Sequence, residues 1–318
     1  MTTRRTRMLL PAAVALTLAG NVVFAAGITV QDARKRDVTI DDPARIVSIG
    51  GAITEILYAL GFDDRLAGVD ATSLFPPAAL RDKPNVGYWR QLSAEGVLGL
   101  NPSLVLAMQG SGPKETIEVL EAARVPLVMV PDTFSERGIL DKIALVGRTM
   151  DAGQRTECLS KAVASDLAQL STLRSKVTRP IRVMFVISFL NGRAVVAGTN
   201  TAANEIIRLA GAVNATDGYE GYKPVSDEAI VTARPDVVLS IARGKDSVEA
   251  ETVFSHPAFA MTPAAEKRAF ISMEGLYLLG FGPRTAAAAR DLAVRLYPEL
   301  APEAEKFKPA ALSTDCRK

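Results

Sequence analysis

A phenol, an indole and a guanidinium stand side by side in the segment Val86–Glu95, an arrangement suited to binding a ligand. The phenolate of Tyr88 would be a hard oxygen ligand for ferric iron, and tyrosinate is one of the protein groups that hold the iron of haem. Arg90 would lower the pKa of that phenol, because a nearby positive charge favours the phenolate. The alternative is that Tyr88 and Trp89 only pack this loop onto the core. In either case Ser93 predicts a helix that starts directly behind the loop.

The rest of the sequence offers little for catalysis. His256 is the single histidine, in a turn-like context where a surface histidine is expected rather than a catalytic base. One histidine and two cysteines without CxxC spacing nearly exclude Ser-His-Asp chemistry, Cys-His chemistry and histidine-rich zinc sites. Neither a GxGxxG nor a GxxxxGK[ST] phosphate-binding motif is present. We therefore expect a binding protein and not an enzyme.

Short β-branched runs alternate with segments of helical periodicity in the first half of the chain. The predicted strands are 45–51, 65–70, 103–107 and 126–130, and the predicted helices are 54–61 and 114–124. Strands that alternate with helices imply a parallel sheet that is covered on both faces.

Two segments recur later in the chain, in the same order. SAEGVLGLNPSLVLA (Ser93–Ala107) matches SDEAIVTARPDVVLS (Ser226–Ser240) without a gap, and TEILYALG (54–61) is echoed by NEIIRLAG (204–211). The repetition predicts an α/β fold of two similar lobes with parallel-rich sheets. The alternative is a chance similarity between two strand–helix units.

A long helix is predicted between the two halves. Residues 151–178 have helical spacing and no internal proline, and some 25 residues make a helix of ~38 Å. We expect this helix to join an N-terminal lobe (26–150) to a C-terminal lobe (179–318), with the ligand in the cleft between them. A single rigid crossing would permit only small movements of the lobes.

The repeat also relates two tyrosines. Tyr88 lies five residues before Ser93, and Tyr222 lies four residues before Ser226. If the lobes face each other, so do these two tyrosine segments. The carboxyl ends of parallel strands, at a cleft between lobes, are where open α/β sheets bind ligands.

Residues 1–25 have the pattern of a secretory signal peptide. Three arginines precede the apolar run 8–20, and the small-residue site Val23–Ala25 follows it. We expect the mature chain to begin at Ala26 and to be a free periplasmic protein, since no cysteine for a lipid anchor stands at the processing point. No later run reaches the ~18 apolar residues of a membrane span.

Size, charge and cysteines set further limits. Roughly 290 mature residues suffice for two domains, each with its own core. The 37 basic and 35 acidic side chains nearly balance, which argues against a nucleic-acid partner, and we expect a monomer. In an oxidising compartment Cys158 and Cys316 either form one disulfide or remain two free thiols, and the sequence leaves both open.

At this point the sequence resembles the periplasmic haem-binding proteins of bacterial haem ABC importers, over almost the whole mature chain. The resemblance rests on RIVSIGGAITEILYALG, VGYWRQLSAEG, GTNTAANEIIRLAGAVNA, YEGYKPVSDEAI and LLGFGPRT. In that family the tyrosine of the GYxR segment ligates haem iron, which implies this role for Tyr88, with Arg90 in support. Related binding proteins dock on permease arginines through one glutamate on each lobe, which implies Glu95 and Glu228. Their place in a first helical turn, where the helix dipole favours acids, and a duplication of the lobe would also explain both.

The resemblance implies that the chain binds ferric haem b as cargo, delivers it to an inner-membrane ABC permease and leaves it chemically unchanged. Some family members hold two stacked haems and use a histidine of the second lobe as an extra ligand. This chain has no histidine in its second tyrosine segment, so such a ligand would have to be Tyr222 or Tyr219. We therefore expect one haem.

The remaining residues of the expected site are less specific. Trp89, Phe75 and Tyr222 are candidates for the walls around the macrocycle. Lys223 and Arg243 are candidates for the propionates, and they are equally well explained as solvated surface charges.

Two other functions remain open. Related proteins on this scaffold carry ferric siderophores or cobalamin, and a siderophore site would need several arginine or aromatic contacts but no iron ligand from the protein. Metal-cluster and chelatase-type enzymes have similar two-lobed folds. They need cysteine or histidine ligands, and the shortage of both weighs against them.

Overall fold

Four short runs of mostly β-branched and aliphatic residues form the sheet of the N-terminal lobe in the computed structural model, which describes residues 27–244 and 246–318. The strands are all parallel, in the order β4-β3-β5-β6: β3 (Ile46–Ile49), β4 (Leu66–Val69), β5 (Leu104–Met108) and β6 (Leu127–Val130). Nearly every strand residue is buried, so both faces of the sheet must be covered. The signal peptide predicted for residues 1–25 lies outside the described residues.

Helices cover both faces of this sheet. The helices of the lobe are α1 (Gly51–Ala59), α2 (Ala78–Asp82), α3 (Ala94–Leu98), α4 (Lys114–Ala122) and α5 (Glu136–Thr149), with the 3-10 turn η1 (Asp63–Arg65). One face of the sheet packs against α1 and α5, and the other packs against α3 and α4. A hairpin of β1 (Ile28–Gln31) and β2 (Asp37–Ile40) completes the lobe.

The C-terminal lobe has a mixed sheet in the order β10-β8-β7-β11-β12, with β9 paired to β7. Its strands are β7 (Arg182–Leu190), β8 (Arg193–Ala197), β9 (Val213–Asn214), β10 (Tyr222–Pro224), β11 (Val237–Ala242) and β12 (Phe270–Glu274). β8 runs antiparallel to β7 and β10, whereas β9, β11 and β12 pair in parallel. The predicted α/β fold of two lobes with parallel-rich sheets is therefore confirmed.

Two layers of helices also cover the C-terminal sheet. The helices are α7 (Ala202–Leu209), α8 (Asp227–Ala233), α9 (Ala250–Phe254), α10 (Pro257–Ala260), α11 (Pro263–Glu266), α12 (Gly275–Leu279), α13 (Thr285–Leu296), η2 (Pro298–Leu300), α14 (Ala301–Ala304) and α15 (Ala310–Ser313). One face packs against α7 and α13, and the other packs against α8, α9 and α10.

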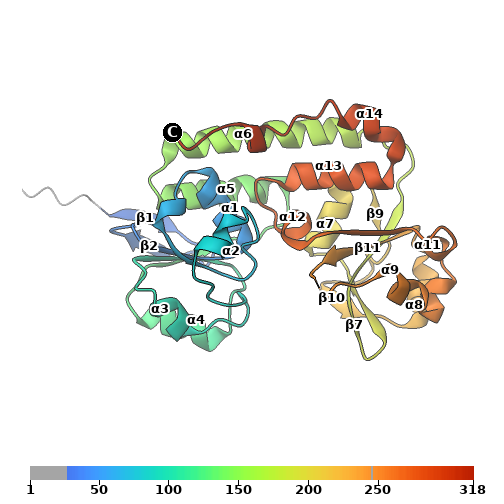
Figure 1. Ribbon diagram of the computed structural model, residues 1–318, viewed down its shortest axis with the longest axis horizontal. Helices are drawn as coiled ribbons and strands as arrows, with labels where there is room; N and C mark the ends of the chain where they lie inside the picture. The colour runs from blue at the N-terminus through green and yellow to red at the C-terminus, as the bar shows by residue number, and fades with distance from the viewer. Residues whose placement is uncertain (1–26, 245) are drawn as a thin grey trace, which may run out of the picture.

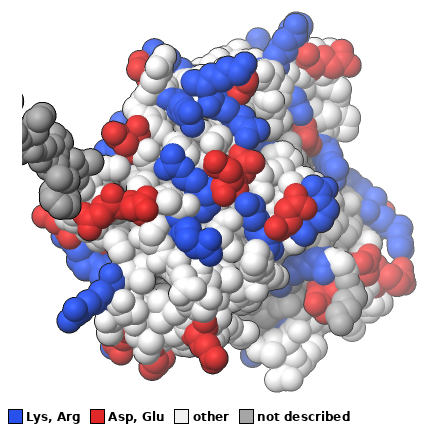
Figure 2. Space-filling view, turned by 60° about the vertical axis from the view of Figure 1, so that its left-hand side comes forward, with Lys and Arg blue, Asp and Glu red and all other residues white. Residues whose placement is uncertain are grey.

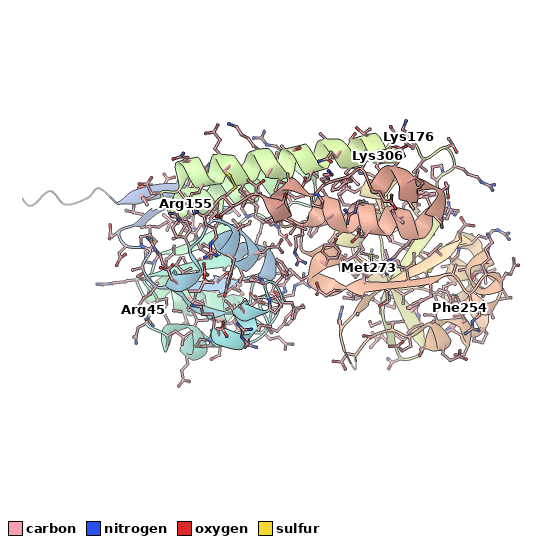
Figure 3. All side chains as sticks on the ribbon, turned by 45° about the horizontal axis from the view of Figure 1, so that its top comes forward. Arg45, Arg155, Lys176, Phe254, Met273 and Lys306 are labelled. Atoms are coloured by element: carbon pink, nitrogen blue, oxygen red, sulfur yellow. A yellow bond between two sulfur atoms is a disulfide. The ribbon has the colours of Figure 1, made fainter. Side chains whose placement is uncertain are left out.

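One long helix, α6 (Gly153–Arg174), spans both lobes (Figure 1). Its 22 residues correspond to about 33 Å, and it lies within the range 151–178 where a helix is expected. Arg155 lies over the N-terminal lobe, and Lys176 lies beyond the other end of the helix, over the C-terminal lobe (Figure 3). The helix packs against α5 of one lobe and α13 of the other, so it supports both.

The C-terminal segment is tied to this helix by a disulfide. Cys158 of α6 is bonded to Cys316, with 5.7 Å between their Cα atoms, which answers the question that the sequence left open. The buried carboxylate of Asp166, also on α6, accepts hydrogen bonds from the N–H groups of Ala310 (2.6 Å) and Ala311 (3.0 Å). The segment therefore follows α6 back towards the N-terminal lobe (Figure 1).

The lobes touch through small residues at the start of α1. A Cβ atom added to Gly51 would lie 2.6 Å from Leu276 Cδ1, and one added to Gly282 would lie 3.4 Å from Ala52 Cβ. Glycine is required at position 51 chiefly because an added Cβ would also lie 2.3 Å from the Thr72 carbonyl oxygen of the same lobe. We call these contacts, together with those of Lys142 below, the lobe junction.

A buried lysine also crosses the lobe junction. Nζ of Lys142, on α5, donates to the Phe281 carbonyl oxygen of the other lobe at 3.3 Å and to Asp132 Oδ1 at 3.3 Å. Burial lowers the pKa of Lys142 because it disfavours the charged amine. The rings of Phe134 and Phe281 pack edge to face beside it, 5.4 Å apart.

Charged side chains of both signs are interspersed on the face of the molecule shown in Figure 2, with no broad surface of one sign. Within the part of the chain that the structure describes, no helix is both long and apolar enough to cross a membrane.

Candidate functional site

The loop that carries Tyr88 is held against the edge strand β4. The Val86 N–H donates to the Val69 carbonyl oxygen at 2.9 Å, and the Ala71 N–H donates to the Gly87 carbonyl oxygen at 2.8 Å. Gly87 has a φ of 91°, in the left-handed region that favours glycine, and it turns the chain out of this pairing immediately before Tyr88. Tyr88 is therefore presented at the carboxyl edge of the sheet.

The second half of the loop is fixed to the segment that follows β5. Gly112 donates its N–H to the Trp89 carbonyl oxygen at 3.0 Å and accepts the Leu92 N–H at 2.8 Å. The Trp89 ring packs against Gly110, where an added Cβ would lie 3.6 Å from the ring. The Arg90 guanidinium lies over the same ring, 4.3 Å from its centroid. Trp89 thus supports the loop by packing against Gly110, and it holds the Arg90 guanidinium by a cation–π contact.

Tyr88 itself is available to a ligand. Its side chain is 42% exposed and its ring meets Trp89 edge to face, with 6.2 Å between centroids. Among the described residues its hydroxyl has no hydrogen-bond partner. A phenol without a competing partner can bind an incoming metal centre through its oxygen.

Tyr222 approaches from the other lobe and has a different environment. Its ring packs on the buried Phe185 at 6.3 Å. Although 38% of the residue is exposed, burial of the phenol raises the pKa of Tyr222 to about 12, against the lowering effect of the positive charges of Arg90 and Arg243. The carboxylate of Asp132 raises the pKa further. Because Arg90 and Asp132 belong to the N-terminal lobe, Tyr222 lies on the side of its own lobe that is near that lobe.

Phe75 is positioned by a buried carboxylate. Asp70, which follows β4, accepts hydrogen bonds from the N–H groups of Gly50 (2.9 Å) and Thr72 (3.0 Å) and from the hydroxyls of Thr72 (2.7 Å) and Ser73 (3.0 Å). These bonds fix the turn that leads to Phe75 at the same edge of the sheet as Tyr88.

A pocket of about 290 Å³ lies between the lobes beside Phe75. Its walls are Leu74 and Phe75 from the N-terminal lobe and Glu274, Tyr277 and Arg284 from the other lobe. The Arg284 guanidinium lies 3.7 Å from the centroid of the Phe75 ring and 5.0 Å from that of Tyr277. Arg284 was not among the residues predicted from the sequence. Its only signal was its place in the GPRT segment that follows α12.

The two cations predicted for the propionates are placed differently. Lys223 is exposed and follows Tyr222 in β10, and successive residues of a strand point to opposite faces. Its side chain therefore leaves the strand on the face opposite the Tyr222 phenol. Arg243 is exposed just beyond β11, and its charge acts on that phenol.

His256 has a structural role outside this site. Its Nδ1 accepts the Ala258 N–H at 3.3 Å and so caps α10, while its Nε2 lies 3.1 Å from the Gly192 carbonyl oxygen. The ring packs against Phe189 and Phe259, and its side chain is only 16% exposed. The ring is therefore half-buried, and it caps a helix beside an aromatic cluster.

Glu95 and Glu228 occupy equivalent positions. Each is exposed in the first turn of a short helix, α3 or α8, and a serine caps each helix. The Ser93 hydroxyl accepts the Gly96 N–H at 3.3 Å, and the Ser226 hydroxyl accepts the Ala229 N–H at 3.3 Å. Figure 1 shows α3 and α8 at the outer ends of the two lobes, on the side away from α6.

No cluster of three or more His, Cys, Asp or Glu residues that could hold a metal ion occurs in residues 27–244 or 246–318.

Comparisons with known proteins agree with this architecture. The family model for the periplasmic binding protein matches residues 46–275. The solved structure of the periplasmic heme-binding protein RhuT from Roseiflexus sp. RS-1, in apo form, is 39% identical, with a TM-score of 0.76 over 80% of this chain and 98% of that one. The periplasmic heme-binding protein BhuT in complex with two hemes is 38% identical, with a TM-score of 0.76 over 81% and 99%. The vitamin B12-binding protein of Yersinia pestis (strain Pestoides F) is 26% identical over 61% of this chain and 68% of its own length.

Proposed function

We propose, from the premise that this chain belongs to the periplasmic binding protein family, that it captures ferric haem in the periplasm and passes it on unaltered. The observation that carries the proposal is the exposed phenol of Tyr88, without a hydrogen-bond partner among the described residues, at the edge where the two lobes face each other. The similarity to two heme-binding proteins at 39% and 38% identity supports haem as the cargo.

In this proposal Tyr88 binds the iron through its phenolate oxygen. Arg90, which lies over the Trp89 ring, places a positive charge in the same loop. Trp89, Phe75 and Tyr222 offer apolar surface to the macrocycle, and Arg243 offers a cation near the opening. These residues bind and orient the cargo and carry out no chemistry on it.

Delivery would use the paired glutamates. Glu95 and Glu228 stand in equivalent helical turns at the outer ends of the two lobes, so both can meet one partner surface at once. We propose that this surface belongs to an inner-membrane ABC permease and carries arginines. The cargo-binding chain then supplies recognition, and ATP is hydrolysed elsewhere in the importer.

A titration of the mature protein with ferric hemin tests the proposal. The wild type should show a saturable one-to-one change with the charge-transfer band of tyrosinate-ligated high-spin iron, and Tyr88→Ala should lose that band. A saturation point of two haems would contradict the single site and resemble BhuT. If the wild type shows no saturable change, the haem proposal fails. If Tyr88→Ala gives an unchanged spectrum, the function stands and the iron ligand is another residue.

Cobalamin is the second candidate, because a vitamin B12-binding protein is among the relatives. The axial positions of its cobalt already carry ligands of its own, so it would not need the Tyr88 oxygen. Calorimetric titration with cobalamin therefore separates the two. Binding of cobalamin that is unaffected by Tyr88→Ala, with no saturable response to hemin, would favour this candidate.

A further inference from the structure

Three polar residues line the pocket beside Phe75, and two of them already use their side-chain oxygens in hydrogen bonds within the protein. The Glu274 carboxylate accepts the N–H groups of Leu276 and Tyr277, both at 2.7 Å, and so caps α12. The Tyr277 hydroxyl donates to Asp291 Oδ2 at 2.8 Å. This leaves Arg284 as the polar wall residue with N–H groups to offer.

The Arg284 guanidinium is buried without enough acceptors. Its side chain is 11% exposed, and neither Nε nor Nη2 has a hydrogen-bond partner among the described residues. Nε lies 3.1 Å from Glu55 Oε1, an ion-pair distance, but without hydrogen-bond geometry. Nε and Nη2 are shielded from the pocket, so the part of the guanidinium that an acceptor in the pocket can reach is Nη1, which no described residue binds. When no such acceptor is bound, the Phe75 ring holds the guanidinium in place, with its centroid 3.7 Å from the Arg284 Cζ atom.

The pocket is too small for a whole macrocycle. Its volume of about 290 Å³ is at the lower limit of ordinary ligand pockets, so it fits one arm of a larger molecule. The loop that begins at Asp70 and carries Phe75 is hydrogen-bonded through Ala71 to Gly87, the neighbour of Tyr88. A ligand whose centre is at Tyr88 can therefore extend an arm towards this pocket.

We infer that Arg284 binds a carboxylate arm of the cargo, which under the proposed function is a propionate of haem. The planar guanidinium and a carboxylate are complementary in charge and in hydrogen-bond geometry. Arg284 is thus a binding and specificity residue, a role that the exposed Lys223 and Arg243 are less well placed to fill.

Glu55 is consistent with this role. It is fully buried, and its carboxylate also accepts the backbone N–H of Arg284 at 3.2 Å. Burial, with a further contribution from the negative charge of Glu274, raises the pKa of Glu55 to about 7 in spite of the nearby Arg284 charge. A second carboxylate at Arg284 can therefore be accommodated by proton uptake at Glu55 at small cost near neutral pH.

A purely structural role is the competing explanation, because Glu55 and Arg284 belong to different lobes and tie them together. Such a role would not depend on the charge of the cargo. We therefore compare ferric hemin with its dimethyl ester, in which both propionates are neutral. The titrations use the mature wild type, Arg284→Gln and Arg155→Gln. Arg155 of α6 is a matched control: it is partly buried, lies 5.1 Å over the Phe62 ring and is not a wall residue of the pocket.

The wild type should bind hemin at least about tenfold more tightly than the ester, since a charged hydrogen bond contributes that much. Arg284→Gln should reduce this preference to near one, and Arg155→Gln should keep it. Equal weakening of both ligands in Arg284→Gln would show a structural role and overturn the inference. So would an unchanged preference.

A second variant covers the case in which Arg284→Gln does not fold. Glu55→Gln retains the arginine and removes its competing acid, so it should raise the preference for hemin over the ester by a few-fold. A preference equal to or below that of the wild type would count against the inference. If the wild type binds hemin and ester equally, both with the Tyr88-dependent band, the haem function stands and only this inference fails.

Discussion

The two lobes repeat one unit of structure but present their tyrosines in different ways. In each lobe a serine-capped helix with an exposed glutamate leads into a buried parallel strand, α3 to β5 and α8 to β11. Tyr88 precedes its unit in a loop on a fully parallel sheet, whereas Tyr222 precedes its unit in β10, at the edge of a mixed sheet.

We propose that this difference decides which of the two phenols binds the metal. The loop leaves the Tyr88 hydroxyl without a hydrogen-bond partner among the described residues, while packing on Phe185 desolvates Tyr222 and raises its pKa to about 12. Under the proposed function, the two repeated units share a docking role, while only the Tyr88 loop provides the iron ligand.

The largest effect is expected when the two tyrosines are compared directly. Tyr88→Phe keeps the ring and removes the oxygen, so haem affinity should fall about a thousandfold, or roughly 4 kcal/mol. Tyr222→Phe should change affinity by no more than about threefold, or roughly 0.7 kcal/mol, because its phenolate is costly to form. Hemin titration followed by visible absorbance measures both. Similar losses of haem affinity in the two variants would show that the two phenols do not differ in iron binding.

The next effect concerns Glu55, where the lobes meet. Its pKa in the folded protein, about 7, is above the ordinary 4.5, so the folded state binds this proton more tightly than the unfolded state. Its contribution to stability is full below pH 4.5 and is lost as pH rises through about 7, with an upper limit of about 3 kcal/mol.

Denaturant unfolding of wild type and Glu55→Gln from pH 4.5 to 8 tests this sign. The free energy of unfolding should fall with rising pH in the wild type and less steeply in the variant. Arg284, Glu274 and Lys142 are the charged groups around Glu55, and the variant retains all three. The same pH slope in both proteins would show that Glu55 is ionised throughout.

Substitution of the two glutamates tests whether both lobes contribute equally to docking. Glu95→Gln and Glu228→Gln should each reduce haem transfer into a reconstituted importer by roughly tenfold, about 1.4 kcal/mol, with haem affinity unchanged. The two losses should be similar because both residues occupy the same turn of equivalent helices. A loss in only one variant would show that one lobe alone guides docking.

The smallest effect is expected at the helix caps. Ser93→Ala and Ser226→Ala each remove one side-chain acceptor for a backbone N–H, which costs about 1 kcal/mol of folding stability. Thermal unfolding should show matched decreases. Unequal losses of stability would show that the two caps contribute different free energies although their geometry is the same.

Much of this arrangement could be predicted from local sequence. Periodic apolar runs predicted β3, β5 and β6, and the gapless match of Ser93–Ala107 to Ser226–Ser240 predicted the equivalent units. These signals are local because hydrogen bonding and burial within one strand or helix depend on near neighbours.

Contacts between distant segments could not be predicted. Glu55 and Arg284 are 229 positions apart, and nothing in either local sequence shows that their side chains meet. The bond between Cys158 and Cys316 was left open for the same reason. The packing of the His256 ring against Phe189 and Phe259 is not visible in its turn context either.

The lobe junction has a kinetic consequence. Gly51 and Leu276 are already in contact, and Lys142 already reaches the Phe281 carbonyl oxygen, so the facing surfaces need no large closing motion before cargo binds. A preformed site loses little conformational entropy on binding, and its association rate should rise linearly with haem concentration without reaching a plateau. Under the proposed function, release of the cargo should then be the slower step, and its rate should depend on the partner that binds α3 and α8.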